Sequence, residues 1–283
     1  MAVESRSIFG SGAEKETFLA LRSSWKDEVD VFPQMSVKAV IGFDRLQAIE
    51  DENEKNYLLQ TEFDYVICWK NKGFPLLVVE FDGIGGGFSR GIRYETRVLP
   101  INDRNRHKKL EAKLRNCGQA GIPVVVVSFD EARRIDATSH LTILDGIIGE
   151  ILASAIFANE LKRQQFSSVH EVEDLEIELS IARNPIKKEI SRLLATLASI
   201  PGKPGIGLPM SQRPLDDRKN DGMIGCHTSV SVGGDEFGAS AYVRDINCRG
   251  FAAYGLAQAL SWLCALQDTV RANNLARADE PSS

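Results

Sequence analysis

Two neighbouring apolar segments carry acidic residues, and no other feature constrains the fold of this chain as strongly. Residues 63–69 (FDYVICW) and 75–81 (PLLVVEF) have the length and composition of buried strands, and the short KNKGF connection between them is typical of a hairpin. A hairpin centred on Lys72 places Asp64 directly opposite Glu80, because each lies eight positions from the centre. Unpaired carboxylates are costly to bury, so this pair needs a positive partner.

The expected spacing of the two carboxylates favours a bound cation. Directly opposed residues on paired strands have Cβ atoms roughly 5 Å apart, and two like charges about 4 Å apart repel by about 4 kcal/mol at an effective dielectric of about 20. Mg²⁺ prefers oxygen ligands and is commonly held by one or two carboxylates. Because side chains alternate along a strand, Asp82 shares a face with Glu80 and extends the acidic group. The alternative is that the second strand ends before Glu80, which leaves both of its acids in solvent at a turn.

A strongly basic segment follows the acidic residues. The chain has a net charge of −5, yet residues 90–115 contain nine lysines or arginines and only three acidic residues. Apolar residues at helical spacing predict a helix over 103–118. Arg106, Lys109 and Lys113 recur at three- and four-residue spacing and form one stripe on that helix. Such a stripe is commonly a solvated face, but beside acids that suit a metal it indicates a phosphodiester substrate.

The order of these elements resembles a known nuclease superfamily. A helix in GAEKETFLALRSS, strands in DVFPQ, FDYVICW and LLVVEFDG, the basic helix and AGIPVVVV follow the order of the restriction-endonuclease-like PD-(D/E)XK superfamily. The resemblance covers residues 11–165. It points to a bacterial branch whose second acidic strand reads Glu-x-Asp-Gly and whose members are similar to very-short-patch repair endonucleases. The resemblance implies an α/β fold with a mixed four-stranded sheet flanked by helices.

The resemblance assigns the acidic residues to a metal site. Asp64 and Glu80 match the metal-binding acids of the superfamily. Asp82 stands where the usual lysine would be, and it is a further candidate ligand and catalytic residue. Superfamily members also tend to carry a glutamate on the first helix, for which Glu14 is a candidate and Glu16 the competing choice.

The resemblance also selects a catalytic lysine on the basic helix. In the matching branch a lysine lies eight residues before the glycine of Gly-Ile-Pro, and the counterpart of that lysine here is Lys113. Lys109, one turn earlier, is the alternative. The aspartate that usually follows the lysine in this branch is Leu114 here, so the match in register is imperfect.

The activity that the resemblance implies is metal-dependent hydrolysis of phosphodiester bonds in nucleic acid, with DNA favoured over RNA. Mg²⁺ or Mn²⁺ would lower the pKa of an attacking water, and Lys113 or Lys109 would stabilise the charge of the transition state. The residues expected to contact nucleic acid are Arg90, Arg93, Arg106 and Lys109. One rival interpretation is a catalytically inactive nuclease fold that only binds nucleic acid, because the Glu-x-Lys lysine is missing. Another is a structural partner in a defence or repair complex.

Two other motifs point to different chemistry but lack the required context. GFSRG, residues 87–91, has the Gly-x-Ser-x-Gly spacing of an esterase nucleophile elbow with Ser89 as nucleophile. That elbow needs a strand directly before the serine and a helix directly after it, and GIRYETRVLP is not helix-like. GIGGG lacks the Gly-x-Gly-x-x-Gly spacing of dinucleotide-binding loops. We therefore interpret residues 83–91 as a mobile glycine-rich loop that carries Arg90.

Composition indicates a soluble protein of two domains. The chain has 283 residues, of which 43% are hydrophobic and 26% charged, enough for a sizeable core. No apolar run approaches the roughly 20 residues of a membrane span, and no leader pattern is present, so we expect a cytoplasmic protein without membrane contact. The five cysteines are widely spaced and contain no Cys-x-x-Cys pair, which predicts reduced thiols.

Three further segments complete the nuclease-like part. The basic helix should form a right-handed crossover that makes strand 75–81 parallel to a strand at 123–128. Residues 141–164 are predicted to form a helix whose apolar stripe packs into the core. Residues 50–55 (EDENEK) are interpreted as a solvated loop within an insertion.

Residues 166–283 are expected to form a smaller α+β accessory domain after a nuclease-like domain at 1–165. A helix at 185–199, with Asn184 as cap and Pro185 in its first position, leads into a Pro/Gly-rich loop, a hairpin and an alanine-rich helix. This order is somewhat similar to a double-stranded-RNA-binding domain. The domain has 12 basic against 15 acidic residues, which argues against that function. We therefore expect it to mediate homodimerisation or to bind a partner protein.

Overall fold

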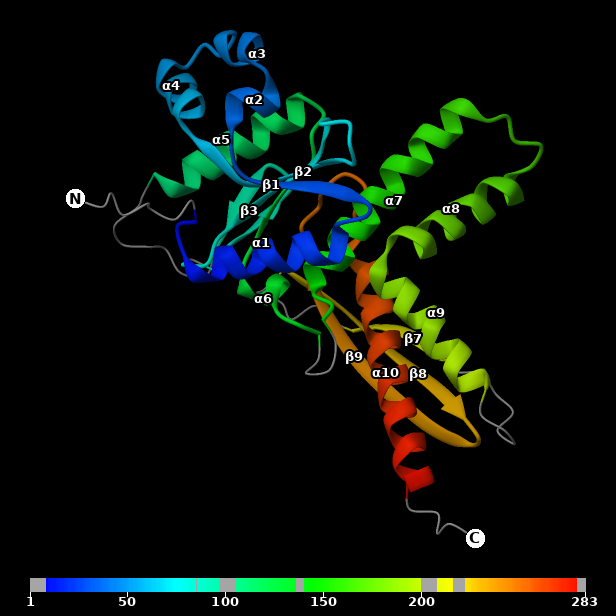
Figure 1. Cartoon of the computed structure of the whole chain (residues 1–283). Helices are drawn as coiled ribbons and strands as arrows, with labels where there is room; N and C mark the ends of the chain where they lie inside the picture. Colours follow the sequence, from blue (N-terminus) through cyan, green and yellow to red (C-terminus); the bar gives the residue numbers. More distant parts are fainter. Residues whose placement is uncertain are drawn as a thin grey trace. The chain divides into compact units, whose positions relative to one another are not determined.

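The computed structural model describes residues 9–84, 86–96, 105–135, 140–199, 208–215 and 222–278. These residues form two compact units, shown in Figure 1. The first extends to Leu144 and includes residues 246–249, and the second comprises 145–245 and the chain from Gly250 onward. The boundary expected from the sequence, at residue 165, lies within the second unit.

The first unit is built on a mixed four-stranded sheet. Its strands, in the order β1-β2-β3-β6, are β1 (Val29–Ser36), β2 (Glu62–Trp69), β3 (Pro75–Phe81) and β6 (Val124–Val127). The pairs β1–β2 and β2–β3 are antiparallel, and β3–β6 is parallel, as the crossover predicted. Tyr65 pairs with Val79 and Ile67 with Leu77, which is the register of a hairpin centred on Lys72. The predicted register is therefore confirmed.

Helices cover both faces of this sheet (Figure 1). On one face, α5 (Arg106–Gln119) packs with buried sheet residues such as Val66, Val78 and Val126 in one core cluster. Adjacent strand residues point to opposite faces, so Tyr65 faces the other side, where its hydroxyl donates to the Glu14 carbonyl of α1 (Gly12–Trp25) at 2.7 Å. The observed α5 agrees with the predicted basic helix, although residues 103 and 104 of the prediction lie outside the described residues.

Two segments that the sequence suggested were loops are ordered elements. Between β1 and β2 the chain forms three short helices, α2 (Val37–Ile41), α3 (Phe43–Gln47) and α4 (Glu52–Gln60). The interpretation of 50–55 as a loop was wrong, because Asp51 caps α4 by accepting from the Asn53 backbone N–H at 2.9 Å. Leu58 of α4 is completely buried, so the helix is held by the core despite its acidic start.

The segment interpreted as a glycine-rich loop, residues 83–91, contains the first strand of a hairpin at residues 88–90. Strands β4 (Phe88–Arg90) and β5 (Arg93–Glu95) pair antiparallel. Further along the chain, the short helix α6 (Phe129–Ala132) follows β6. Ser89 is completely buried, and its hydroxyl oxygen accepts the Val126 backbone N–H at 2.9 Å. This bond attaches the hairpin to the sheet. Gly85 of the segment lies outside the described residues.

The second unit combines helices with a three-stranded antiparallel sheet. Its elements are α7 (Ile143–Arg163, within this unit from Asp145), α8 (Val169–Arg183), α9 (Pro185–Ala198), β7 (Pro209–Leu215), β8 (Met223–Val232), β9 (Asp235–Arg244) and α10 (Ala253–Ala278). The predicted Asn184 cap, Pro185 start, hairpin and final helix are confirmed. Strand β7 was missed, because it lies at the sheet edge, where prolines are tolerated, within a segment rich in Pro and Gly.

The described residues bear on two further expectations. No helix among them has the length and apolar character that crossing a bilayer requires. The five cysteines are free thiols, as expected, and Cys68, Cys117 and Cys226 are buried.

The side chain of Asn184 should contribute strongly to the stability of the second unit. Its buried side chain accepts the Ile186 N–H at 3.0 Å and donates to Glu150 Oε1 at 2.8 Å. Asn184→Ala removes both bonds, so we expect it to lower the free energy of unfolding by about 2 kcal/mol. Ser168→Ala, at the exposed cap of α8, is the matched control and should cost about 0.5 kcal/mol. Urea unfolding followed by circular dichroism measures both, and equal losses would contradict this assignment.

Candidate functional site

A buried ion pair joins the central strand to the basic helix. Lys113 Nζ of α5 donates to both carboxylate oxygens of Glu80 on β3, each at 2.9 Å. The same ammonium donates to the Glu62 carbonyl at 2.6 Å and lies 5.4 Å from the centre of the Phe63 ring. Lys113 is 5% and Glu80 4% exposed. The structure thus brings together the lysine and the glutamate that the sequence selected.

Burial controls the protonation of this pair. Desolvation raises the pKa of Glu80 to about 7, and the nearby charge of Asp64 adds to that shift, whereas Lys113 opposes it. Burial alone would lower the pKa of Lys113, but attraction to Glu80 outweighs it, and the pKa of Lys113 is raised. Lys113 therefore stays charged through the neutral range, and Glu80 ionises near pH 7. The two-oxygen contact corresponds to ionised Glu80.

Asp64 lies opposite Glu80 on the continuation of the β2–β3 register. Its Oδ2 accepts the Phe81 backbone N–H at 2.7 Å, so the carboxylate reaches across to β3. Burial raises the pKa of Asp64, and the negative charge of Glu14 adds to this, whereas the Phe81 N–H and Lys113 lower it. Asp64, Glu80, Lys113 and Glu14 therefore form one electrostatic group. Glu14 itself accepts the Gly10 N–H at 2.8 Å at the start of α1.

Asp82 has surroundings unlike those of the other two acids. It is 1% exposed, and its carboxylate accepts hydrogen bonds from the Tyr94 hydroxyl, from the Gly87 N–H at 3.1 Å and from the guanidinium of Arg106. Both oxygens are thus used by donors from the β4–β5 hairpin and from the start of α5. This arrangement favours a structural role for Asp82 over metal ligation.

Gly87 is required where the Asp82 cluster is tightest. A Cβ atom at Gly87 would lie 2.4 Å from the Tyr94 ring, well inside contact distance. The absence of a side chain lets the backbone N–H reach Asp82 while the ring covers it. The glycine-rich sequence here therefore serves close packing around a buried carboxylate.

The other predicted nucleic-acid contacts lie apart from the ion pair. Lys109 is exposed on α5, with its ammonium 5.6 Å from the centre of the Tyr57 ring. Arg90 and Arg93 are exposed, and they occupy directly opposed positions on the paired strands β4 and β5. Arg106 is committed to Asp82, so it is less available to a ligand than the sequence suggested. Arg97 and Arg104 of the basic segment lie outside the described residues.

Sequence reasoning missed two residues beside the acids. Gln34 on β1 falls opposite Asp64 in the β1–β2 register, its side chain hydrogen-bonds to Asp64, and its φ of 51° is in the left-handed region that non-glycine residues rarely adopt. Tyr57 on α4 lies close enough to Lys113, Glu80 and Asp64 for their charges to affect its pKa, which burial raises. A polar residue after Pro33 in an apolar strand was the available signal for Gln34. Nothing in the sequence pattern pointed to Tyr57.

Comparison with known proteins adds little to this geometry. Residues 6–140 match the model of a family described as a protein of unknown function, DUF2726. This match covers the sheet, the ion pair and the Asp82 cluster, and it ends before the second unit. No curated protein and no solved structure matches the chain.

The stability of the protein should depend on pH because burial raises the pKa of Glu80. Its pKa rises from the ordinary 4.5 to about 7 on folding, so between these values the folded state holds a proton that the unfolded state has lost. Stability of the metal-free protein should therefore fall as pH rises through this window. Glu80→Gln cannot ionise, so between pH 4.5 and 8 the stability difference should shift in favour of the variant by about 1–3 kcal/mol. Denaturation in EDTA at each pH measures this, and a constant difference would contradict it.

Asp82→Asn should destabilise the first unit. The amide cannot accept all three donors, and it leaves Arg106 without its buried counter-charge, so we expect a loss of about 2–4 kcal/mol. The matched control is Asp30→Asn, which breaks the more exposed pair with Lys70 and should have a much smaller effect. Thermal unfolding of the two variants tests this, and a similar loss in both would argue against a structural role for Asp82.

Proposed function

We propose that the chain is a metal-dependent nuclease whose first unit has a restriction-endonuclease-like fold of the PD-(D/E)XK kind. The observation that carries this proposal is the group of Asp64, Glu80 and Lys113 on adjacent strands and the following helix. Two carboxylates and a lysine converging at one sheet position suit phosphodiester hydrolysis better than the other chemistries considered. The hydroxyl oxygen of Ser89, the rejected esterase nucleophile, accepts a backbone N–H within the core.

The acidic residues present fit a hard divalent cation. Asp64 and Glu80 supply carboxylate oxygens, which Mg²⁺ and Mn²⁺ prefer, and Mg²⁺ is commonly bound by only two protein carboxylates with water and substrate phosphate as the rest. The described residues contain no group of three or more acidic, histidine or cysteine side chains arranged as a metal cluster. The proposal therefore needs the substrate to contribute ligands. When bound, the metal would supply Lewis-acid activation of the phosphate.

Lys113 has a defined task in this mechanism. Its ammonium holds both oxygens of Glu80 and is itself fixed by the Glu62 carbonyl, so the carboxylate is oriented before any ligand arrives. If Asp64 and Glu80 hold the cation that binds the scissile phosphate, the positive charge of Lys113 beside Glu80 would help to stabilise the negative charge of the transition state. Gln34 would keep Asp64 in place through its side-chain hydrogen bond.

Exposed cations of the first unit would bind the nucleic acid backbone. Lys109 follows Arg106 by three residues on α5 and precedes Lys113 by four, so it lies on the same stripe but at the surface. Arg90 and Arg93 extend from the hairpin that Asp82 anchors. Cations of this kind attract any phosphate backbone, so the proposal favours DNA over RNA only through the family resemblance.

Nuclease activity should depend on the three central residues. With labelled DNA and RNA, single- and double-stranded, products should form with Mg²⁺ or Mn²⁺ but not with EDTA. Asp64→Asn, Glu80→Gln and Lys113→Met should each lower the rate by ~10²–10³. The controls are Asp30→Asn in the same sheet and Lys108→Met on the same helix, which should cleave at the wild-type rate.

The outcomes of that assay separate the alternatives. Cleavage that survives Glu80→Gln would contradict the assignment of the site. Binding without cleavage under every metal condition would favour the inactive, nucleic-acid-binding interpretation. Circular dichroism of each variant distinguishes a lost reaction from a lost fold.

A further inference from the structure

Helix α8 contributes no residue to the buried core of the second unit. None of its 15 residues is buried, whereas the next helix, α9, buries Ile186, Ile190, Leu193 and Leu197 along one stripe. In contrast, Val169, Ile177 and Ile181 of α8 are 71%, 58% and 40% exposed. Apolar side chains gathered on an exposed helix mark interaction surfaces.

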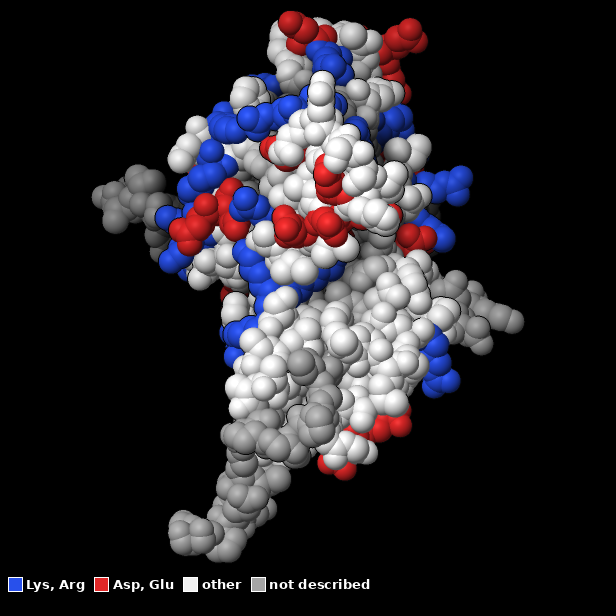
Figure 2. All heavy atoms as spheres, turned by 90° about the vertical axis from the view of Figure 1, so that its right-hand side faces the viewer, with Lys and Arg blue, Asp and Glu red and all other residues white. Residues whose placement is uncertain are grey.

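Helix α8 is also strongly acidic. It carries five acidic residues and one arginine, at its end; the acids are Glu171, Glu173, Asp174, Glu176 and Glu178. Glu171 is bound by Ser167, and Glu173 pairs with His170, but the last three acids have no ion-pair partner within the described part of the chain. Figure 2, which views the side where α7 and α8 lie, shows a group of acidic side chains at the centre of the face with basic ones around it.

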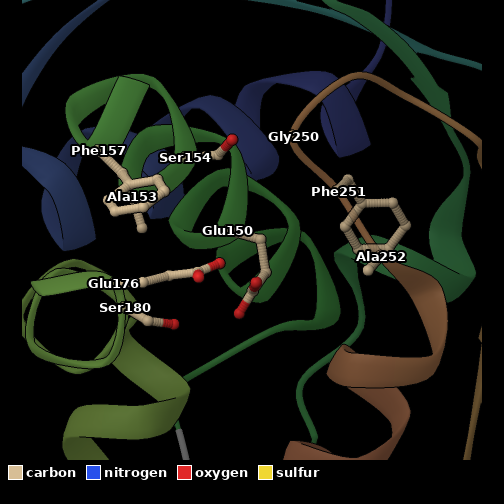
Figure 3. Close-up of a pocket in the computed structure, with 9 residues that line it drawn as sticks. All are labelled: Glu150, Ala153, Ser154, Phe157, Glu176, Ser180, Gly250, Phe251 and Ala252. Carbon is tan, nitrogen blue, oxygen red and sulfur yellow. The ribbon is translucent and has the colours of Figure 1, made fainter. Parts of the chain in front are cut away.

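A cavity opens beside α8 within the second unit. It has a volume of about 310 Å³, at the lower end of the range for small-ligand pockets, and it is lined by side chains of α7 and α8 and by residues 250–252. Figure 3 shows the carboxylates of Glu150 and Glu176 close together at its centre, with the ring of Phe157 on one side and that of Phe251 on the other. A cavity of this volume can hold one long side chain.

The lining of the cavity is net acidic, because Lys187 pairs with only one of its two carboxylates. Glu150 is held through one oxygen, Oε1, by Lys187 Nζ and Asn184 Nδ2, each at 2.8 Å. The described residues provide no hydrogen bond to its other oxygen or to the carboxylate of Glu176. The hydroxyls of Ser154 and Ser180 add acceptors, although Lys187 already donates to Ser180. Carboxylates beside aromatic rings match a guanidinium, which donates in a fork and stacks on rings.

We propose that α8 and this cavity form a docking site for a basic amphipathic segment of a partner protein, with one arginine of the segment inserted between Glu150 and Glu176. The apolar side of the segment would cover Ile177 and Ile181, and its other cations would face the acids of α8. Charge complementarity selects this occupant over nucleic acid, whose phosphates the acidic helix repels. The site stands independently of the proposed nuclease activity, because it lies within the second unit.

A peptide probe tests the docking site on the full chain. The probe is a fluorescein-labelled helical peptide with arginines on one face and leucines on the other, and fluorescence polarisation measures its affinity. We expect saturable binding that weakens at least about tenfold when every arginine is replaced by citrulline, which has the same size but no charge. Glu176→Lys should weaken binding of the arginine peptide at least about tenfold.

A matched control separates binding at this cavity from general electrostatic attraction between the peptide and the acidic protein. Asp268→Lys makes the same change from an acid to a base in the same unit, on α10 and away from the cavity, and should weaken binding less than about twofold. Equal weakening by the two variants would overturn the proposal, as would equal binding of the citrulline peptide or no saturable binding to the wild type. Saturable binding of a labelled oligonucleotide to the wild type that strengthens in Glu176→Lys but not in Asp268→Lys would also overturn it, in favour of nucleic acid.

Discussion

The ion pair between Lys113 and Glu80 links the central strand of the first unit to helix α5, and the site depends on this link. Removing one partner of a buried pair leaves an uncompensated charge and costs ~3–5 kcal/mol. The pair therefore fixes where α5 lies on the sheet as well as the orientation of the carboxylate. A hydrophobic pair could join helix and strand at lower desolvation cost, so a charged pair at this position is consistent with the proposed chemical role.

A second buried carboxylate, that of Asp82, holds the elements around Glu80 in place. Asp82 lies two residues after Glu80 and gathers donors from the β4–β5 hairpin and from Arg106 at the start of α5. Glu80 and Asp82 thus both hold α5, the first through Lys113 in the middle of the helix and the second through Arg106 at its start. The two acids of the Glu-x-Asp-Gly sequence thus have different partners: Glu80 pairs with Lys113, and Asp82 anchors the β4–β5 hairpin and the start of α5.

The sequence predicted the parts of the fold that local pattern determines. The short connection between two apolar strands predicted the register that places Asp64 opposite Glu80, and the family resemblance selected Lys113, which bonds to Glu80. Sequence reasoning failed where tertiary contacts override local preference. The cap at Asp51 and the burial of Leu58 stabilise a helix in an acidic segment whose composition is typical of a loop. Ser89 anchors a hairpin next to glycine-rich sequence. Gln34 and Tyr57 come from separate elements, so only the folded chain brings them to the acids.

The two units show opposite solutions for their charged residues. In the first, Glu80 and Asp82 are buried and paired with cations, and the cations proposed to bind phosphate, Lys109, Arg90 and Arg93, are exposed. In the second, α8 leaves Asp174, Glu176 and Glu178 without basic partners among the described residues and adds exposed apolar side chains. A surface that is both acidic and apolar is poorly suited to a polyanion and well suited to a basic amphipathic segment. A partner bound there would not compete with nucleic acid for the same charges, so both could bind one chain.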